Sequence, residues 1–427
     1  MKVLVVGGGA REHAIEWRLG QNPTVDRLYA APGNAGIARE ATCVPVAADD
    51  VRGIIDLVER ENIDLTVVGP EAPLVAGLVD SLEYRGYKVF GPTKAAARIE
   101  GSKAWAKELC ERHQIPAGRS RAFTEITSAV GYLDALGPGP VVIKADGLAA
   151  GKGVTVAEER ATAVAALEAC LVDRAFGEAG AVALVEEFLT GREVSAFALT
   201  DGRDVLPLAL AQDFKRIGDG DTGPNTGGMG AYSPVPFVDA VTERRIWDDI
   251  VRGTIAAMGA EGVRYRGLLY VGLMLTDRGP MVLEFNCRFG DPETEAILPR
   301  LRSDLGELLL ASVEGNLSNY KVHWSEECCV TVVIASGGYP GEYETGVEIA
   351  GISEADDVEG ALVFHAGTAE RDGRVVTAGG RVLAVSALGG TLADARALAY
   401  EACGRIAFPA MQYRTDIAAA AAEGVGP

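Results

Sequence analysis

The chain has 427 residues, of which 48% are hydrophobic, and this length is typical of roughly two to four domains with buried cores. Its 60 acidic and 40 basic residues give a net charge of -20, which excludes broad electrostatic attraction to nucleic acid or anionic membrane surfaces. The seven cysteines include no C-x-x-C pair, and the sequence has no run of about 18 apolar residues and no signal-peptide pattern. We therefore expect a cytoplasmic protein without disulfides, structural zinc or membrane segments.

The first 101 residues predict a parallel α/β unit. Apolar strands are expected at residues 1–6, 28–30 and 65–68, and each runs into a glycine-containing loop before a helix. The carboxyl ends of parallel strands meet at one edge of a sheet, so the three loops should converge on one crevice. Glu12 stands where the dinucleotide fingerprint needs its third glycine, and the second strand lacks the acid that grips a ribose. A phosphate-sugar site is one interpretation, and three ordinary turns are the other.

Residues 140–156 predict a strand, a glycine-rich loop and a second strand, after a helix that Ser102 should cap. The loop is not a Walker loop, because only three residues separate Gly147 from Gly151 and no helix follows directly. A mobile hairpin that closes over nucleotide phosphates fits the pattern, with Lys144 and Lys152 as cationic contacts. A surface hairpin with solvated lysines is the alternative.

Two further segments have polar chemistry. The strand expected at 181–189 carries acids that could line an adenine slot, or it is an edge strand with exposed acids. Residues 218–230 include six glycines mixed with Asp, Thr, Asn and Pro, whereas flexible linkers are usually richer in Ser. We predict a lid that keeps water from a reactive phosphorylated intermediate, with a plain linker as the alternative.

Residues 267–276 and 281–286 predict a hairpin whose second strand carries Glu284 and Asn286. Side chains alternate along a strand, so these two point to the same face. A hard cation such as Mg²⁺ takes oxygen ligands, with one or two from the protein and the rest from phosphates and water. We interpret Glu284 and Asn286 as metal ligands. The alternative is an ordinary strand end whose polar residues are solvated.

The rest of the chain predicts a leucine-striped helix through residues 298–310 and a last unit with strands at 329–335, 361–364 and 381–385 and a helix from 391 to about 406. We predict three domains: 1–101, 102–325 with an inserted subdomain at about 122–190, and 326–427.

Taken together, the chain resembles the ATP-grasp ligases, and among them the glycinamide ribonucleotide synthetase family, over nearly its whole length. The resemblance rests on long ordered strings, which are residues 9–13 (GAREH), 31–36 (APGNAG), 68–74 (VGPEAPL), 143–153 (IKADGLAAGKG), 221–232 (DTGPNTGGMGAY) and 284–293 (EFNCRFGDPE). It implies an α/β and α+β multidomain fold, with a Rossmann-like N-terminal domain, an ATP-grasp central domain with an inserted hairpin subdomain, and a small mixed C-terminal domain.

The resemblance also implies an activity, which is the ATP-dependent ligation of glycine to 5-phosphoribosylamine through a glycyl phosphate in purine biosynthesis. ATP would be the co-substrate and Mg²⁺ or Mn²⁺ the metal. The partners would be these small molecules, with no nucleic acid and no membrane, and the protein would be a monomer.

The same resemblance implies roles for individual residues. The metal would lie at Glu284 and Asn286, and Arg288, Lys144 and Lys152 would serve the chemistry. The remaining residues divide into ATP contacts, which are Lys103, Lys144, Lys152, Glu186, Phe188 and Glu193, and substrate contacts, which are Gly9, Arg11, Asn34, Glu71, Asp213, Lys215, Arg288 and Asp291.

Two departures from the family pattern stand out. Many members of the family carry a further glycine before the Arg-Glu-His run, where this chain has Gly8-Gly9-Ala10. The strand at 267–276 lacks the second acidic metal ligand that many ATP-grasp enzymes have there. Three other functions stay open on sequence alone: another ATP-grasp ligase or carboxylase, a nicotinamide-dependent oxidoreductase, and an ATP-binding regulatory protein without turnover.

Overall fold

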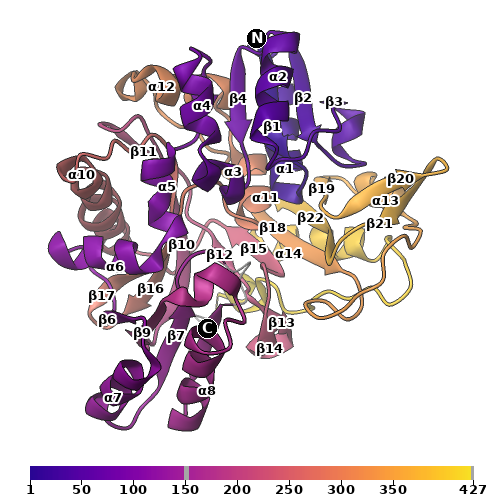
Figure 1. The fold of residues 1–427 in the computed structure, drawn as a ribbon. Coiled ribbons are helices and arrows are strands. Elements are labelled where there is room, and N and C mark those ends of the chain that lie inside the picture. The colour runs from indigo at the N-terminus through magenta and orange to yellow at the C-terminus, as the bar shows by residue number, and fades with distance from the viewer. Residues whose placement is uncertain (149–152, 425–427) are drawn as a thin grey trace.

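The N-terminal region of the computed structural model, which describes residues 1–148 and 153–424, is a doubly wound α/β unit (Figure 1). Its five strands are all parallel, in the order β3-β2-β1-β4-β5, as the strand-loop-helix pattern predicted. The strands are β1 (Lys2–Gly7), β2 (Arg27–Pro32), β3 (Thr42–Cys43), β4 (Leu65–Val68) and β5 (Val89–Phe90). The helices are α1 (Ala10–Gly20), α2 (Val51–Glu61), α3 (Glu71–Ala76), α4 (Leu78–Tyr84) and α5 (Lys94–Gly101).

The single helix expected through Val75, Leu78 and Leu82 is wrong in detail. Gly77 takes a left-handed conformation with φ 96°, which ends α3 and begins α4.

The loops after β1, β2 and β4 converge, as predicted. The Gly33 N–H donates to Gly7 O at 3.0 Å, and the Gly69 N–H donates to Val6 O at 3.0 Å. The approach is closest at Gly8, where an added Cβ would lie 2.5 Å from the carbonyl oxygen of Gly33. The absence of a side chain at Gly8 is therefore what lets the first two loops touch.

The central region contains two antiparallel sheets. The first has the order β6-β9-β7-β8 and packs against α7 and α8, and it extends downward in Figure 1. Its elements are β6 (Ser120–Phe123), α7 (Ile126–Leu136), β7 (Val141–Ala145), β8 (Val154–Ala157), α8 (Arg160–Leu171) and β9 (Ala183–Glu187). The β7–β8 hairpin is as predicted. Phe123 ends strand β6, and helix α7 begins at Ile126.

Helix α6 (Lys103–Arg112) precedes this sheet and begins as expected, because the Ser102 hydroxyl accepts from the Trp105 N–H at 3.2 Å.

The second central sheet has the order β11-β10-β16-β17, and it positions the polar site. Its strands are β10 (Arg192–Thr200), β11 (Val205–Pro207), β16 (Gly267–Thr276) and β17 (Gly279–Asn286). The predicted hairpin of β16 and β17 is present, with Gly272 opposite Glu284 and Tyr270 opposite Asn286. Helical segments nearby are α9 (Ala240–Arg245), a π-helical turn (Ile246–Arg252) and α10 (Gly253–Ala260).

The leucine-striped helix expected at 298–310 is interrupted. Helix α11 (Glu293–Ile297) passes into a 3-10 turn (Leu298–Arg300), and α12 (Leu305–Glu314) begins afresh. Asp304 caps α12 by accepting from the Glu307 N–H at 3.0 Å, which explains the restart.

The last sheet has the order β12-β15-β18-β22-β19, so two of its strands come from residues that precede 326. The segment 212–233, which the sequence placed in the central domain, supplies β12 (Gln212–Asp213) and β15 (Gly230–Ser233), and between them lies a hairpin of β13 (Arg216–Gly218) and β14 (Thr222–Asn225). The other strands are β18 (Cys328–Ala335), β19 (Ala361–His365) and β22 (Arg381–Gly389). Helix α14 (Leu392–Cys403) packs on β18 and β22, and α13 (Ile352–Asp356) and α15 (Ala419–Ala422) complete the unit.

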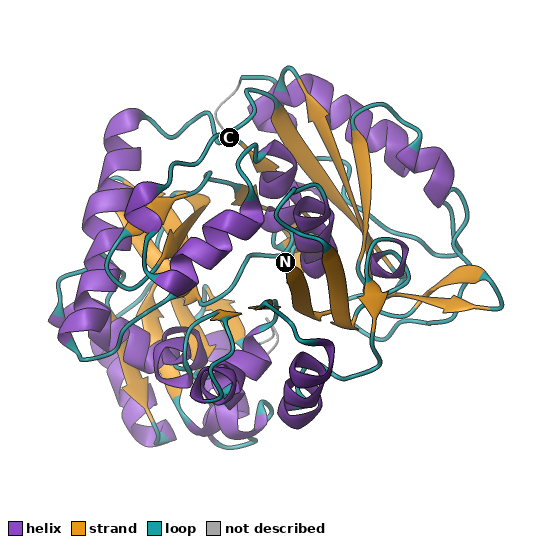
Figure 2. Cartoon of the chain, turned by 90° about the horizontal axis from the view of Figure 1, so that it is seen from above, coloured by secondary structure: helices purple, strands orange, loops and turns teal. Residues whose placement is uncertain are grey.

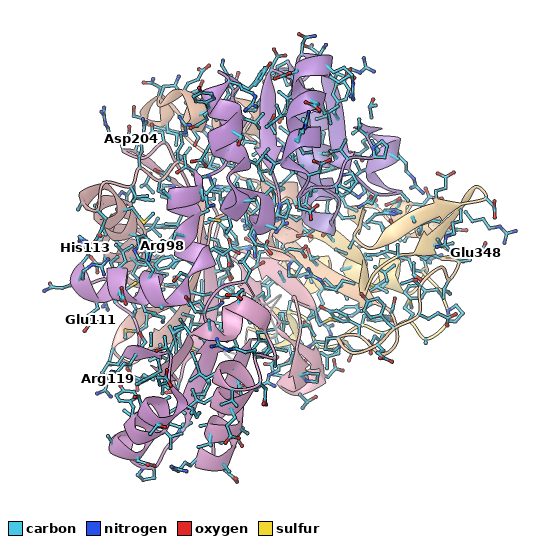
Figure 3. The ribbon with its side chains drawn as sticks, viewed as in Figure 1. Arg98, Glu111, His113, Arg119, Asp204 and Glu348 are labelled. Carbon is cyan, nitrogen blue, oxygen red and sulfur yellow. The ribbon has the colours of Figure 1, made fainter. Side chains whose placement is uncertain are left out.

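A second hairpin, β20 (Thr368–Arg371) with β21 (Arg374–Thr377), extends away from the C-terminal sheet in both ribbon views (Figures 1 and 2). Charged side chains such as Glu111, Arg119 and Glu348 lie at the periphery of the molecule (Figure 3). Over residues 1–148 and 153–424, no helix combines the length and the apolar character that crossing a membrane requires.

The contact between the first two loops gives a test of the fold. In Gly8→Ala the new Cβ must push against the Gly33 carbonyl, so we expect a loss of about 1–3 kcal/mol in the free energy of unfolding, measured by urea denaturation. Gly20→Ala is the control, because its Cβ would make an ordinary contact, 3.5 Å from Leu28 Cδ1. Equal stability of the two variants would contradict the close packing of these loops.

Candidate functional site

Strand β17 carries the centre of the site. Glu284 lies beside Lys215, with its Oε1 3.7 Å from Nζ. Burial disfavours the charge of Glu284, but Lys215, Lys144 and Lys103 together lower the pKa of this carboxyl below its ordinary value. Glu284 is thus an anion that three lysine side chains face.

Asn286 lies two residues further along the same strand face. With its amide oriented to satisfy its neighbours, the nitrogen donates to Glu100 Oε1 at 3.0 Å and to Phe285 O at 3.1 Å. The amide oxygen is then the atom that a cation would take. Among the residues the structure describes, no three His, Cys, Asp or Glu side chains cluster to hold a metal. One carboxylate and one amide therefore fit an ion such as Mg²⁺ that completes its shell with phosphate and water.

Arg288 is held between two acids. Its Nη2 lies 3.2 Å from Glu100 Oε1, and its Nε lies 3.4 Å from Glu71 Oε2. Glu71 belongs to the N-terminal domain, and burial opposes its charge, but Arg288 and Arg11 lower its pKa. The guanidinium thereby ties the end of β17 to the first residue of α3.

Glu100 is a site residue that the sequence analysis missed. Its carboxylate also accepts from the Cys287 N–H at 2.7 Å. Glu100 therefore contacts three consecutive residues, Asn286, Cys287 and Arg288, of the segment 284–293, which we call the site stretch. A signal existed in the sequence: Ala96, Ala97, Ile99 and Glu100 are the buried positions of α5, which puts an acid on the apolar face of the helix.

Three lysines, Lys103, Lys107 and Lys144, lie where the β6-β9-β7-β8 sheet meets β17. Lys144 Nζ lies 3.0 Å from Glu186 Oε2 and donates to Leu283 O at 3.1 Å. Lys107, which the sequence analysis did not select, lies 3.2 Å from the same Glu186 oxygen. Lys103 donates to Gly147 O at 2.6 Å. Burial lowers the pKa of both Lys103 and Lys107.

Glu186, predicted at the adenosine, is therefore engaged by two lysines. Phe188 follows the end of β9, and Lys152 lies outside the described residues.

Lys215 lies among four carboxylates, those of Glu193, Glu284, Asp213 and Glu293. Its Nζ lies 2.8 Å from Glu193 Oε2, opposite the contact with Glu284. Burial raises the pKa of Asp213 to about 8. Lys215 lowers this pKa, whereas repulsion from Glu293, Glu193 and Glu284 raises it further. Burial also raises the pKa of Glu293, whose Oε1 accepts from the Ser195 hydroxyl at 3.0 Å. The group is a partly buried acid-base cluster next to the proposed metal ligands.

The N-terminal loops contribute less directly. Glu12, in the place of the fingerprint glycine, accepts from the Gly9 N–H and from Arg11 Nε, both at 2.6 Å. Arg11 also donates to Phe289 O at 3.3 Å, so it touches the site stretch. The Glu12 carboxylate thus accepts the hydrogen bond of the Gly9 N–H, a donor that the first loop could otherwise offer to a phosphate.

The side-chain amide of Asn34 makes hydrogen bonds within the N-terminal domain and to the C-terminal domain. Its Nδ2 donates to Gly8 O at 3.0 Å and to His365 O at 2.7 Å, and its Oδ1 accepts from the Gly36 and Ile37 N–H groups. The structure brings Asn34 to the C-terminal domain rather than to Glu284.

Asp291 pairs with Arg381 of β22, at 2.8 Å between Oδ1 and Nη1. The same Nη1 donates to Gly227 O at 2.6 Å. Arg381 was not predicted, because nothing in its local sequence marks it, and it fastens the glycine-rich loop to the site stretch.

Comparison with known proteins places this geometry in context. The chain matches three family models in succession: Phosphoribosylglycinamide synthetase, N domain, over residues 1–100; its ATP-grasp (A) domain over 101–294; and its C domain over 329–420. Phosphoribosylamine–glycine ligase of Caldanaerobacter subterraneus subsp. tengcongensis is 48% identical over 98% of this chain and 100% of its own length. The enzyme of that name from Salmonella typhimurium is 50% identical over 98% of both.

Two solved structures support the same fold. Phosphoribosylamine–glycine ligase of Thermotoga maritima superposes with a TM-score of 0.84 at 34% identity, over 98% of this chain and 100% of that one. Biotin carboxylase of Campylobacter jejuni superposes with a TM-score of 0.73 at 15% identity, over 96% and 92% of the two chains, and shows the fold alone.

The raised pKa of Asp213 predicts a pH dependence of stability. Between about pH 4 and about pH 8 the folded chain keeps a proton on this carboxyl that the unfolded chain has released, so its contribution to stability falls as pH rises. Asp213→Asn removes that dependence. We therefore expect the free energy of unfolding of the wild type, minus that of the variant, to decrease from about pH 5 to about pH 8 in urea titrations.

Asp56→Asn on α2 controls for the loss of one exposed aspartate. A difference between wild type and Asp213→Asn that stays constant with pH would contradict the raised pKa.

Proposed function

Because the chain belongs to the phosphoribosylglycinamide synthetase family, we propose that it ligates glycine to 5-phosphoribosylamine at the expense of ATP. The products are glycinamide ribonucleotide, ADP and phosphate, a step of purine biosynthesis.

The reaction has two bond-forming steps. A glycine carboxylate oxygen attacks the γ-phosphorus of ATP, ADP leaves, and glycyl phosphate results. The amine of 5-phosphoribosylamine then attacks the acyl carbon, phosphate leaves, and the nitrogen gives up a proton as the amide forms. Both steps depend on positioning and on neutralising phosphate charge.

The residues divide by charge in this proposal. Lys103 and Lys144 offset the charge of ATP, with Lys152 as a third cation from the hairpin loop, and Arg288 faces the acyl phosphate. Glu186 keeps Lys144 in place, while Phe188 and Glu193 serve the adenosine. Asp213 and Lys215 are proposed as contacts of 5-phosphoribosylamine.

Glu284 and Asn286 would hold the metal. A Mg²⁺ or Mn²⁺ ion held by them would neutralise phosphate charge. Gly9, Arg11, Asn34, Glu71 and Asp291 are proposed around 5-phosphoribosylamine. Of these, Arg11 and Glu71 reach the site stretch directly, whereas Asn34 acts by joining the domains.

One observation carries the proposal: an ionised carboxylate and an amide share one face of β17 amid Lys103, Lys144, Lys215 and Arg288. The test is ADP release and amide formation with glycine and 5-phosphoribosylamine made in situ, with other amino acids as controls. Activity with another amino acid but none with glycine would overturn the assignment.

The metal site gives its own prediction. Glu284→Gln keeps the shape of the side chain but removes its charge, so kcat should fall on the order of 100-fold or more while the fold is retained. Steady-state ADP release measures the loss, and circular dichroism checks the fold.

Asp277→Asn, at the exposed turn between β16 and β17, is the matched control and should keep full activity. Near wild-type kcat in Glu284→Gln would exclude this residue as a metal ligand.

A further inference from the structure

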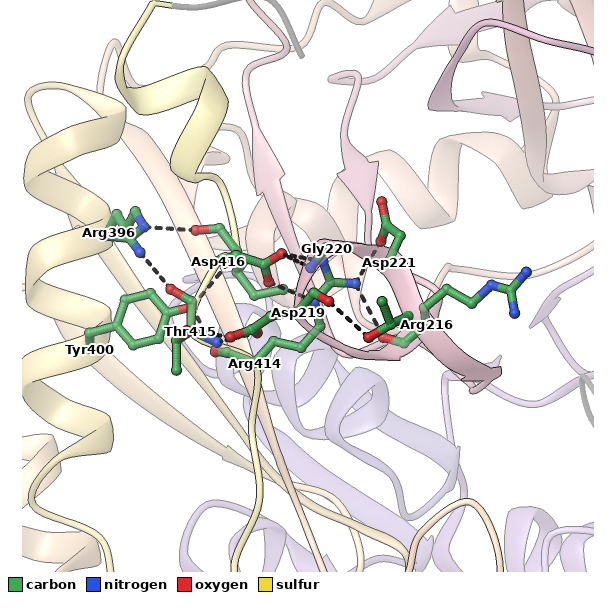
Figure 4. A network of polar contacts seen from close by, with 11 residues as sticks. Arg216, Asp219, Gly220, Asp221, Arg396, Tyr400, Arg414, Thr415 and Asp416 are labelled. Atoms are coloured by element: carbon green, nitrogen blue, oxygen red, sulfur yellow. Dashed lines mark hydrogen bonds and ion pairs between the residues drawn. The ribbon is translucent and has the colours of Figure 1, made fainter.

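Arg414 is the largest fully buried side chain of the described chain, and it lies outside every motif discussed above. Its Nε and Nη2 form a two-pronged pair with the Asp416 carboxylate at 2.7 and 2.6 Å. Nη1 reaches the Asp221 carboxylate at 2.7 Å and the Arg216 carbonyl at 3.2 Å. The guanidinium thus joins the C-terminal segment, residues 414–417, to strand β13 and to the turn of the β13–β14 hairpin (Figure 4).

The neighbours of Arg414 repeat the same connection. The Thr415 N–H donates to Asp219 Oδ1 at 2.8 Å, and the Gly220 N–H donates to Asp416 Oδ2 at 2.8 Å. The hairpin turn is therefore tied down by three successive residues of the C-terminal segment. Asp219 and Asp221 are exposed, so each carboxylate can be altered without disturbing a core.

Side chains of helix α14 hydrogen-bond to the backbone of the C-terminal segment. Tyr400 donates its hydroxyl to Arg414 O at 2.8 Å, and Arg396 donates to Thr415 O at 2.6 Å and to Ile417 O at 3.0 Å. The anchor is rigid because α14 packs on the C-terminal sheet.

Arg414 also reaches toward the site through Phe214. Its guanidinium carbon lies 4.9 Å from the centre of the Phe214 ring, a distance typical of a cation–π contact. Phe214 stands between Asp213 and Lys215, and the backbone here is extended beside β15, with Phe214 N–H donating to Gly230 O at 3.0 Å. Successive side chains of an extended segment point to opposite faces. Holding Phe214 on one face therefore fixes Lys215 toward Glu193 and Glu284 on the other.

We propose that Arg414 is a positioning residue for the ligation, one that fixes Lys215 through Phe214 and holds the β13–β14 hairpin over the site so that the amine, and not water, takes the acyl group. The inference rests on the proposed function. Water attack on glycyl phosphate gives glycine and phosphate, so a loosened hairpin consumes ATP without forming amide.

The test compares ADP released with amide formed. In the double variant Asp219→Asn/Asp221→Asn we expect the ratio to rise from one ADP per amide to about two or more, with a higher KM for 5-phosphoribosylamine. Arg414→Lys should do the same, because an ammonium cannot reproduce the two-pronged pair. Trypsin cleavage after Arg216 should be about 5-fold faster or more in both variants, as expected for a segment that opens locally.

The controls are Asp372→Asn, at the exposed turn of the other hairpin, and Arg405→Lys, whose exposed pair with Glu401 spans 3.1 Å. Both should keep a ratio of one. If Arg414→Lys does not fold, the double variant decides, since its two changes are on the surface. An unchanged ratio and KM in the double variant would overturn the inference. A wild-type enzyme that forms no amide would overturn the proposed function itself, and the trypsin measurement, which needs no turnover, separates the two failures.

Discussion

The constraint on which the rest of the structure depends is charge balance in a partly buried site. Charges removed from water are costly unless each has a partner, and here they alternate. Lys215 lies between Glu193 and Glu284, and Arg288 between Glu71 and Glu100. Glu71 and Glu100 belong to the N-terminal domain and Arg288 to the central one, so the arrangement of these two domains is what keeps Arg288 paired.

Lys103 donates to the Gly147 carbonyl and makes no ion pair within 4.0 Å with an acid of the residues that the structure describes. A polyphosphate supplies the missing negative charge. The net charge of -20 spread over the chain would otherwise repel an anionic nucleotide, and local cations at β17 overcome that repulsion at short range.

The sequence was sufficient where local rules decide the structure. The capping of α6 by Ser102 and the shared face of Glu284 and Asn286 follow from spacing alone, and both are present. It was insufficient where tertiary contacts decide. Glu100 and Arg381 lie far in sequence from the residues they hold, so the acid on the apolar face of α5 indicates burial without its partner, and Arg381 has no local signal at all. The same reason explains β12 and β15: a two-residue and a four-residue strand acquire their sheet only from the partner β18, about a hundred residues later.

Gly272 shows how such packing limits what the site can become. It lies opposite Glu284 across the β16–β17 ladder, and a Cβ there would be 3.1 Å from Glu284 Cγ, while the register shifts at the next residue. Many ATP-grasp enzymes carry an acid on this strand, but in this chain a carboxylate at 272 would first have to displace the one at 284. The two positions are therefore not free to diverge independently.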